Sequence, residues 1–347
     1  MSGQTGDEVA GAGLVRLSTY VLFVDYGAEV EVQHTVRGTV QRVDRSTYED
    51  LLGFQGFRAP AERHVPWVDA GVLVPPFRDR PEHHGGLRPG TEAQLGRDYQ
   101  DWYWRREVEA EREYRWLGRR IVKMPSDLFF YQELIAGHRL DAVLEIGYGD
   151  GGGLWFFASV LALLRGGLVV GLDREHCKDL PEFDRLAGVR VELVHGDAHE
   201  AATVEAVREL RPQGFGLVVV DADPRPEGKV GLLRRWAPMV APEGYLVVED
   251  VESPECRGMA GMSAVVGEGV DMLLLEGAGF GVAVEAGRCP LIKGRGAVLY
   301  RLPAVADVTF RGTAPESARR LTPEGKAYDL ARHAPESDPA PCPVSSR

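Results

Sequence analysis

The chain has 347 residues, which predicts at least two domains, and its formal net charge of −12 argues against a general nucleic-acid binder with a basic face. Its four cysteines are widely spaced and form no C-x-x-C pair, so we expect neither a disulfide framework nor a zinc knuckle. No stretch has the order of a signal peptide, and no apolar run reaches the ~18 residues of a membrane span. We therefore expect a soluble, cytoplasmic protein with no membrane partner.

Residues 1–76 predict a small N-terminal α+β domain. Between Leu14 and Asp44 apolar and polar residues alternate, as they do in paired strands, with a turn at Tyr26-Gly27. Residues 44–47 offer helix caps, and they predict a helix through Leu52, followed by a second short helix at 60–67 and a strand at 70–74. This order is similar to small winged-helix-like domains; the alternative is an oligomerisation or lid module.

Three further segments are distinguished by composition. Residues 77–100 combine prolines and glycines with charges and predict a linker. Residues 101–120 are rich in charged and aromatic residues and predict a helix, whose aromatic side chains offer a contact surface for a homo-oligomer. Residues 304–347 contain many prolines and few large apolar residues, and they predict a mobile tail. The main domain is therefore expected at 101–303.

Within this main domain, short apolar runs alternate with helical stretches. Strands are expected at 142–146, 168–172, 189–194, 216–220 and 244–248, and the clearest helices at 154–164, 201–210 and 230–240. Such alternation predicts a doubly wound, Rossmann-like α/β fold with a parallel sheet and right-handed crossovers. Two more strands, near 271–276 and 297–302, would complete a seven-stranded sheet.

The first strand of this sheet runs into a glycine-rich loop. After Glu145, five of the seven residues from Gly147 to Gly153 are glycines, which lets a ligand approach the backbone closely. The loop fits the G-x-G-x-x-G dinucleotide pattern, with Asp173 near the expected acidic position. It is equally similar to the glycine-rich motif of S-adenosylmethionine (SAM) methyltransferases, whose strand ends in an acid that binds the ammonium of SAM. Glu145 favours SAM, because an acid would repel the diphosphate of a dinucleotide.

The remaining residues of this predicted cofactor site lie in the loop and at the ends of the next two strands. Ligands of doubly wound sheets bind beyond the carboxyl ends of the strands. Asp173 is expected to accept the ribose hydroxyls of the adenosyl group, and Asp197 to lie at the adenine edge, although a single acid in such a place is often only a helix cap. The full predicted set is Glu145, Gly147, Tyr148, Gly149, Gly151, Asp173 and Asp197.

Acids also follow the fourth and fifth predicted strands, at Asp221, Asp223 and Glu249-Asp250. Carboxylates that converge repel one another unless one is protonated or a cation lies between them. A hard divalent cation with oxygen ligands, most simply Mg²⁺, is the predicted occupant of the space between them. The alternative is that these acids cap helices or pair with nearby arginines such as Arg225.

An ordered set of motifs resembles a known family. The pattern is W-x-G, K-x-P-x-D, Y-Q-E, E-x-G and V-E-D, and the residues that carry it are Trp116-x-Gly118, Lys123-x-Pro125-x-Asp127, Tyr131-Gln132-Glu133, Glu145-x-Gly147 and Val248-Glu249-Asp250. Over roughly residues 114–302 the chain resembles the cephalosporin hydroxylase family, which includes rhamnosyl O-methyltransferases. The resemblance implies a SAM- and Mg²⁺-dependent methyltransferase. It implies that Asp221, Glu249 and Asp250 hold the metal, and that Glu145, Gly147, Asp173 and Asp197 line the SAM site.

The general base departs from the pattern of the family. Members often carry a histidine shortly after the fourth-strand acid, and catechol methyltransferases place a lysine base at the position of Pro224. Lys123, the one lysine in a family motif, and Asp223 are the catalytic candidates. A hydroxyl bound to Mg²⁺ becomes more acidic, so a separate base is not required.

Taken together, these residues predict an O-methyltransferase. Its expected acceptor is a catechol, vicinal diol or hydroxy-carbonyl of a specialised-metabolite or peptide-derived substrate, and the resemblance implies a role in antibiotic biosynthesis. Two other classes stay open. A non-heme iron hydroxylase would use His195-x-Asp197 with His333. A non-catalytic module would bind SAM or a nucleotide and use the N-terminal domain for a partner.

Overall fold

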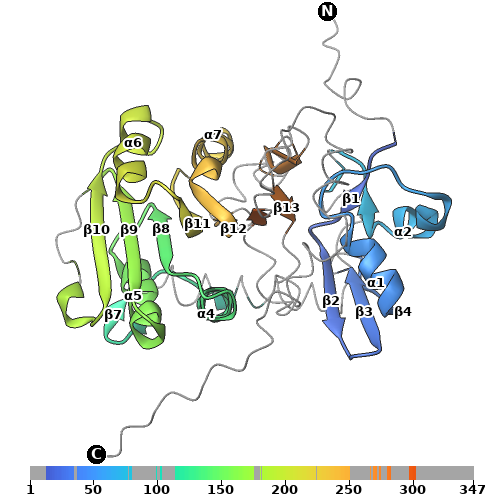
Figure 1. The fold of residues 1–347 in the computed structure, drawn as a ribbon, viewed down its shortest axis with the longest axis horizontal. Helices are drawn as coiled ribbons and strands as arrows, with labels where there is room; N and C mark the ends of the chain where they lie inside the picture. The colour runs from blue at the N-terminus through green and yellow to red at the C-terminus, as the bar shows by residue number, and fades with distance from the viewer. Residues whose placement is uncertain are drawn as a thin grey trace, which may run out of the picture.

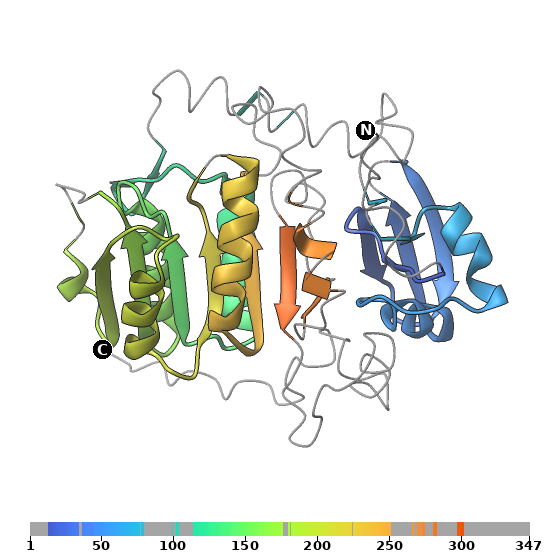
Figure 2. The same cartoon turned by 90° about the horizontal axis from the view of Figure 1, so that it is seen from above.

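The computed structural model describes residues 13–34, 37–76, 78–79, 99, 102–103, 114–175, 180, 182–223, 225–250, 266, 269–271, 273–274, 280–282 and 297–301. These residues form one large sheet with helices on both faces and a smaller N-terminal part with sheets of its own (Figures 1 and 2). The predicted tail and most of the predicted linker lie outside the described residues. Within the described residues, no helix is long and apolar enough to cross a membrane.

The large sheet has seven strands in the order β10-β9-β8-β11-β12-β14-β13. Its five parallel strands are β8 (Ala142–Ile146), β9 (Gly167–Asp173), β10 (Val189–His195), β11 (Phe215–Val220) and β12 (Val240–Val248). At the edge, β14 (Ala297–Arg301) pairs antiparallel with β12, and β13 (Phe280–Val282) pairs antiparallel with β14. The predicted parallel doubly wound sheet is therefore confirmed, with two antiparallel strands added to it.

Alternate side chains of the central strands pack against different helices, because successive residues of a strand point to opposite faces. On one face Leu144 and Val218 pack with α6 (Ala201–Leu210) and α7 (Pro226–Trp236). On the other face Val143 and Val219 pack with α4 (Pro125–Gly137) and α5 (Gly152–Leu164). Figure 1 shows α6 and α7 above the sheet and α4 and α5 below it. Short 3-10 helices complete the connections, η5 at Phe183–Arg185 and η6 at Ala237–Met239.

Three predicted elements need correction. The helix predicted at 101–120 ends as a hairpin of β6 (Arg115–Trp116) and β7 (Arg119–Arg120), because Leu117 and Gly118 adopt positive φ values of 45° and 85° and turn the chain back. The helix predicted at 230–240 is α7, which begins four residues earlier, at Pro226. The described residues within 271–276 are helical, and the sixth strand of the sheet lies later, at β13.

The N-terminal part contains a three-stranded antiparallel sheet and a two-stranded one. The first comprises β2 (Val21–Asp25), β3 (Glu29–His34) and β4 (Thr39–Asp44), and the second pairs β1 (Arg16–Leu17) with β5 (Leu73–Val74). The predicted helix after Asp44 is α1 (Arg45–Leu52), and the Asp44 carboxylate accepts a hydrogen bond from Thr47 N at 2.7 Å. The second short helix is η2 (Glu62–His64) followed by α2 (Val65–Asp69). The α+β character is confirmed, and the winged-helix likeness stays a prediction.

A buried ion network joins this N-terminal part to the large sheet. Arg16 is only 1% exposed, and its guanidinium contacts Asp271 at 2.7 Å and Asp79 at 3.1 Å. Phe57 also packs into the hydrophobic core of the large sheet. Asp79 belongs to the predicted linker, yet it is buried and accepts hydrogen bonds from Ser18 and Thr19. Residues 78–79 are thus part of the packed N-terminal structure.

Candidate active site

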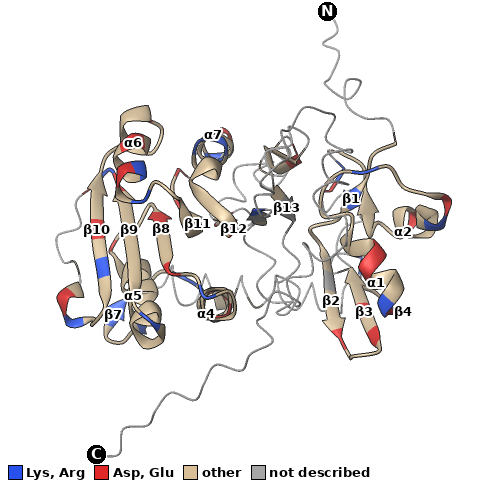
Figure 3. Cartoon of the chain, in the orientation of Figure 1, with Lys and Arg blue, Asp and Glu red and all other residues tan. Residues whose placement is uncertain are grey.

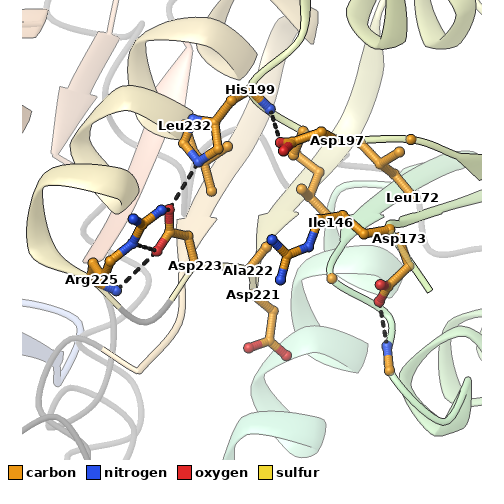
Figure 4. A pocket seen from close by; sticks show the side chains of 15 residues that line it. Ile146, Leu172, Asp173, Asp197, His199, Asp221, Ala222, Asp223, Arg225 and Leu232 are labelled. Atoms are coloured by element: carbon orange, nitrogen blue, oxygen red, sulfur yellow. Dashed lines mark hydrogen bonds and ion pairs between the residues drawn. The ribbon is translucent and has the colours of Figure 1, made fainter.

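The predicted acids lie together at the carboxyl edge of the parallel sheet. Glu145 is the penultimate residue of β8 and Asp173 the last residue of β9, while Asp221 and Glu249 immediately follow β11 and β12. In Figure 3 the central strands are mostly tan, with red at the end of β8. A cavity of about 460 Å³ opens at this edge (Figure 4). Its lining residues are Ile146, Gly147, Gly149, Leu172, Asp173, Arg174, Gly196, Asp197, Ala198, His199, Asp221, Ala222, Asp223, Arg225 and Leu232.

The glycine-rich loop forms one wall of this cavity. Gly147 has φ +89°, and a Cβ atom at this position would overlap the backbone carbonyl of Asp221. Its amide donates to Leu172 O at 2.8 Å, which ties the loop to the second strand. Gly151, at φ +76°, caps the start of α5 in the left-handed conformation. The loop therefore needs glycine both for its dihedral angles and for its close contact with the next strand end.

Asp173 holds the loop from the opposite side. One of its carboxylate oxygens accepts from Gly149 N at 3.0 Å, and the other accepts from Glu175 N at 3.0 Å. Asp197 accepts from His199 N at 2.8 Å, so it also caps a turn in addition to lining the cavity. Both acids remain placed for an adenosyl group.

The other predicted cofactor residues lie behind the cavity wall. Tyr148 is 6% exposed and packs in the core between the sheet and α5. Gly151 gives the backbone its left-handed turn at the start of α5. Glu145 is 1% exposed and is not among the residues that line the cavity, and its side chain contacts Lys123. Its contact with the ammonium of SAM stays a prediction.

The ammonium of Lys123 lies among three carboxylates from neighbouring strands. Its Nζ is 3.0 Å from Glu145 Oε1, 2.9 Å from Asp221 Oδ2, and 2.8 and 2.9 Å from the two oxygens of Glu249. Tyr131, on α4, donates its hydroxyl to Glu249 Oε1. We call Lys123, Tyr131, Glu145, Asp221 and Glu249 the lysine–acid cluster. The Lys123 side chain is only 3% exposed, so the cluster closes the inner end of the site.

Burial and charge act against each other in this cluster. Burial alone would lower the pKa of Lys123, but the attraction of Asp221, Glu249 and Glu145 outweighs it and raises that pKa well above its usual value. Burial raises the pKa of Glu145 to about 7 in spite of the neighbouring ammonium. Burial likewise raises the pKa of Asp221 and of Glu249. A raised pKa favours the protonated form of Lys123 at neutral pH, which argues against a role as general base; its catalytic role stays a prediction.

The second catalytic candidate, Asp223, is held as an anion. Its carboxylate accepts from Arg225 Nε at 2.8 Å and Nη2 at 2.7 Å, and it lies 3.0 Å from His199 Nε2. These hydrogen bonds, above all those from Arg225, lower the pKa of Asp223 far below its usual value. Figure 4 shows Asp223, Arg225 and His199 in one group, with the Asp221 side chain pointing away from it. A carboxylate with so low a pKa is a poor proton acceptor, so Asp223 suits an orienting role.

The fit of a divalent metal is partial. Asp221 and Glu249 supply the hard oxygen donors that Mg²⁺ prefers, and Asp250 follows directly. Asp250 has a positive φ of 60°, which bends the chain away from the strand. Among the residues that the structure describes, however, no group of three or more His, Cys, Asp or Glu side chains is arranged to hold a metal, and Lys123 already occupies both oxygens of Glu249.

Sequence reasoning assigned no role to two residues of this region. Tyr131 stands in the Y-Q-E motif, and its hydroxyl contacts Glu249. Lys229, on α7, is 1% exposed and donates to the main-chain oxygen of Glu249 at 2.7 Å. A signal was present for the lysines, because the chain has only five of them among its 40 basic residues. The iron alternative receives no support, because His195 does not line the cavity that Asp197 lines and His333 lies outside the described residues.

Comparison with known proteins identifies the class of this site. Residues 109–258 match the family model described as Rhamnosyl O-methyltransferase/CmcI. The Rhamnosyl O-methyltransferase of Mycobacterium leprae (strain TN) is 26% identical over 159 residues, which are 45% of this chain and 67% of that protein. The protein of the same name from Mycobacterium tuberculosis (strain ATCC 25618 / H37Rv) is 24% identical over 159 residues, or 45% of this chain and 63% of that protein. The chain thus spans about two thirds of the length of these curated relatives.

Solved structures give matches with low scores. A CmcI structure with Mg and SAM is 19% identical with a TM-score of 0.41, over 55% of this chain and 76% of that chain. MycE methyltransferase from the mycinamycin biosynthetic pathway, in complex with Mg and SAH, is 14% identical with a TM-score of 0.32, over 72% of this chain and 71% of that chain.

The matched family segment coincides with the glycine-rich loop and all the strand-end acids, which defines a SAM-dependent methyltransferase. Over residues 109–258 the chain is similar to the Rhamnosyl O-methyltransferase/CmcI family. The recognition made from the sequence motifs is confirmed.

Proposed function

We propose that this protein transfers the methyl group of SAM to a hydroxyl oxygen of a small acceptor. The observation that carries the proposal is that one cavity combines the glycine loop, Asp173 and Asp197 with a further carboxylate, Asp221. The first three suit the adenosyl part of SAM, and Asp221 supplies a hydrogen-bond acceptor at a different place on the wall. The family match covers all four features.

In this proposal the cofactor is held mostly by backbone and by Asp173. The ribose hydroxyls donate to the Asp173 carboxylate, and the glycine backbone at Gly147 and Gly149 gives room for the methionine part. Asp197, with His199 fixed beside it, lies at the base. Glu145 acts from behind the loop, as a counter-ion of Lys123.

The acceptor hydroxyl is expected to meet the cofactor near Asp221. The Asp221 carboxylate accepts the hydrogen bond of the hydroxyl, and the hydroxyl oxygen attacks the methyl carbon in line with the C–S bond. The O–C bond forms as the C–S bond breaks, S-adenosylhomocysteine leaves, and the hydroxyl proton passes to Asp221. When bound, Mg²⁺ would make the hydroxyl more acidic and orient two oxygens of the substrate, and Asp221, Glu249 and Asp250 are the residues that would hold it.

The acceptor class follows from this arrangement and from the relatives. The mycobacterial relatives are named for methylation of a rhamnosyl group, which is a sugar with neighbouring hydroxyls. A vicinal diol, a catechol or a hydroxy-carbonyl offers the same pair of oxygens. We therefore place the substrate among such hydroxylated specialised metabolites or peptide-derived compounds. The protein would act in the cytoplasm as a homo-oligomer.

Calorimetric titration of the full chain with SAM, S-adenosylhomocysteine and NAD, each with and without Mg²⁺, tests the cofactor. Binding of SAM and S-adenosylhomocysteine, with no response to NAD, is the expected result; NAD binding without SAM binding overturns the proposal. A panel of rhamnosides, catechols and hydroxy acids, read out by S-adenosylhomocysteine release, then tests catalysis. If none of these compounds gives S-adenosylhomocysteine release above background at saturating SAM, the result would favour a non-catalytic SAM-binding module.

The acid residues are tested separately. The double variant Glu249→Gln with Asp250→Asn is expected to lose methyl transfer while its affinity for S-adenosylhomocysteine stays within about threefold, since neither residue lines the cofactor cavity. Full activity of this variant, or of the wild type in excess EDTA, would refute a metal at this site and leave the SAM proposal standing.

A further inference from the structure

Two buried lysines meet the strand-end acids, and they differ in what they bind. Lys229 donates to a main-chain oxygen, that of Glu249, at 2.7 Å, so it fixes the backbone between Glu249 and Asp250. Lys123 binds only side-chain carboxylates, and these come from β8, β11 and β12, three strands that are neighbours in the sheet. Lys123 is therefore the residue that sets the charge of the cluster.

The charges of the lysine–acid cluster do not balance. Three carboxylates, those of Glu145, Asp221 and Glu249, pair directly with one ammonium, that of Lys123, and Lys229 adds a weaker attraction at Asp221 alone. The Tyr131 hydroxyl adds a hydrogen bond but no positive charge. The buried Oε2 atom of Glu145 has no hydrogen-bond partner. The cluster thus has capacity for more positive charge. The oxygens best placed for a cation, those of Glu249, are nevertheless both within 2.9 Å of Lys123.

We propose that Lys123 is the resident cation of this cluster and that a divalent metal must compete with it for the carboxylate of Glu249. The proposal rests on the proposed function, in which Asp221, Glu249 and Asp250 hold the metal. An ammonium and a divalent ion cannot share the same oxygens without strong repulsion at this separation. Lys123 therefore weakens metal binding, and it keeps the three strand ends together while no metal is bound.

The test is direct titration with Mn²⁺, followed by the paramagnetic resonance signal of the free ion, on the full chain saturated with S-adenosylhomocysteine. Lys123→Met is expected to bind Mn²⁺ about tenfold more tightly than the wild type, because the competing charge is gone. Lys123→Arg keeps the charge and is expected to bind no more tightly. Tyr131→Phe is the matched control: it removes a hydrogen bond from Glu249 without changing charge, and its Mn²⁺ affinity should stay within about threefold.

A charge-balanced pair guards against misfolding. Lys123→Met leaves three buried carboxylates without a counter-ion, which can unfold the chain. Lys123→Met with Glu145→Gln removes one charge of each sign, so the net charge of the cluster stays the same. This pair is still expected to gain affinity for Mn²⁺, because Glu249 is freed. Adding Glu249→Gln to it should abolish the gain.

The outcomes separate this inference from the proposed function. Mn²⁺ affinity that is unchanged or weaker in the charge-balanced pair overturns competition and makes Lys123 a structural residue only. A gain that persists after Glu249→Gln overturns Glu249 as the contested ligand. If the wild type does not bind S-adenosylhomocysteine, the methyltransferase proposal is refuted. The Mn²⁺ titrations, repeated without that ligand, would still show whether Lys123 competes with the metal.

Discussion

The site has two ends that are built in different ways. The loop end, Gly147 to Gly153 with Asp173, comes from a short stretch of chain and is shaped by backbone dihedral angles. The acid end joins Lys123 to Asp221 and Glu249, which are 98 and 126 positions away in sequence, and is shaped by buried charge. The loop end should therefore respond to changes in volume and conformation, and the acid end to changes in charge.

The largest effect is expected from Gly147→Ala. The added Cβ would overlap the Asp221 carbonyl at a φ of +89°, so the loop must move away from the strand ends. We expect the affinity for S-adenosylhomocysteine, measured by calorimetry, to fall by about 100-fold or more. Gly149→Ala is the control, because its φ is +50° and no atom lies within 4 Å of the added Cβ. It should cost about tenfold at most; equal losses in both variants would assign the effect to dihedral strain alone.

The next largest effect is expected when one carboxylate at each end of the site is neutralised. Asp173→Asn removes the charge that accepts the ribose hydroxyls and also holds Gly149 N. Charged hydrogen bonds of this kind predict a loss of about 10- to 30-fold in S-adenosylhomocysteine affinity. Asp221→Asn, at the acid end, should leave that affinity within about threefold and reduce methyl transfer instead. If Asp221→Asn weakened the cofactor as much as Asp173→Asn does, the two ends would not be separate.

The same division explains what could be predicted from the sequence. The five parallel strands are short and mainly apolar, although β10 contains Arg190 and Glu192, and the glycine loop is a local pattern. Both features could therefore be predicted from the sequence. The strand predicted at 271–276 is wrong because its apolar residues are too few to show a period, and a short apolar segment fits a buried helix as well as a strand. The turn at Leu117-Gly118 was missed inside a charge-rich segment that otherwise favours a helix.

The acid end could be predicted only in part. That acids would meet at neighbouring strand ends followed from the order of strands. That a lysine from the segment before α4 would take Glu145 and Glu249 as partners depends on tertiary packing, which no local pattern encodes. The position of Glu145 in the motif is clear from the sequence, but its burial behind Gly153 is visible only in the fold.

A smaller effect is expected on stability, from Glu145→Gln. The pKa of Glu145 in the folded protein, about 7, is above its unfolded value of about 4.5, so the folded state binds this proton more tightly. The contribution of Glu145 to the free energy of unfolding therefore falls as pH rises from about 4.5 to 7. The wild type should lose about 3 °C more in Tm than Glu145→Gln between pH 5 and pH 8, measured in EDTA.

The control for this comparison removes an exposed carboxyl from the same region. Glu133, on α4, lies on the surface, and its carboxylate accepts a hydrogen bond from the side-chain amide of its neighbour Gln132. The control variant is Glu133→Gln. It should show the same decline in Tm as the wild type. If the Tm of Glu145→Gln falls between pH 5 and pH 8 as much as that of the wild type and of Glu133→Gln, Glu145 is not the source of the pH dependence. The ionisation that destabilises the fold would then lie elsewhere in the cluster, at Asp221 or Glu249.

The smallest effect is expected from Asp223→Asn, which tests the predicted catalytic role of this residue. Asn keeps the shape and tolerates the positive φ of 50° at this position. If Asp223 only orients Arg225 and His199 at the cavity wall, its loss should lower the affinity for S-adenosylhomocysteine by about threefold. The pH profile of methyl transfer should then stay unchanged. A general base would behave differently: the rate would fall by about 100-fold or more, and the acidic limb of the profile would disappear. Because Arg225 lowers the pKa of Asp223 so strongly, we expect the small loss of affinity and the unchanged pH profile. Among the described residues of the lysine–acid cluster, Asp221 is then the one carboxylate that lines the cavity.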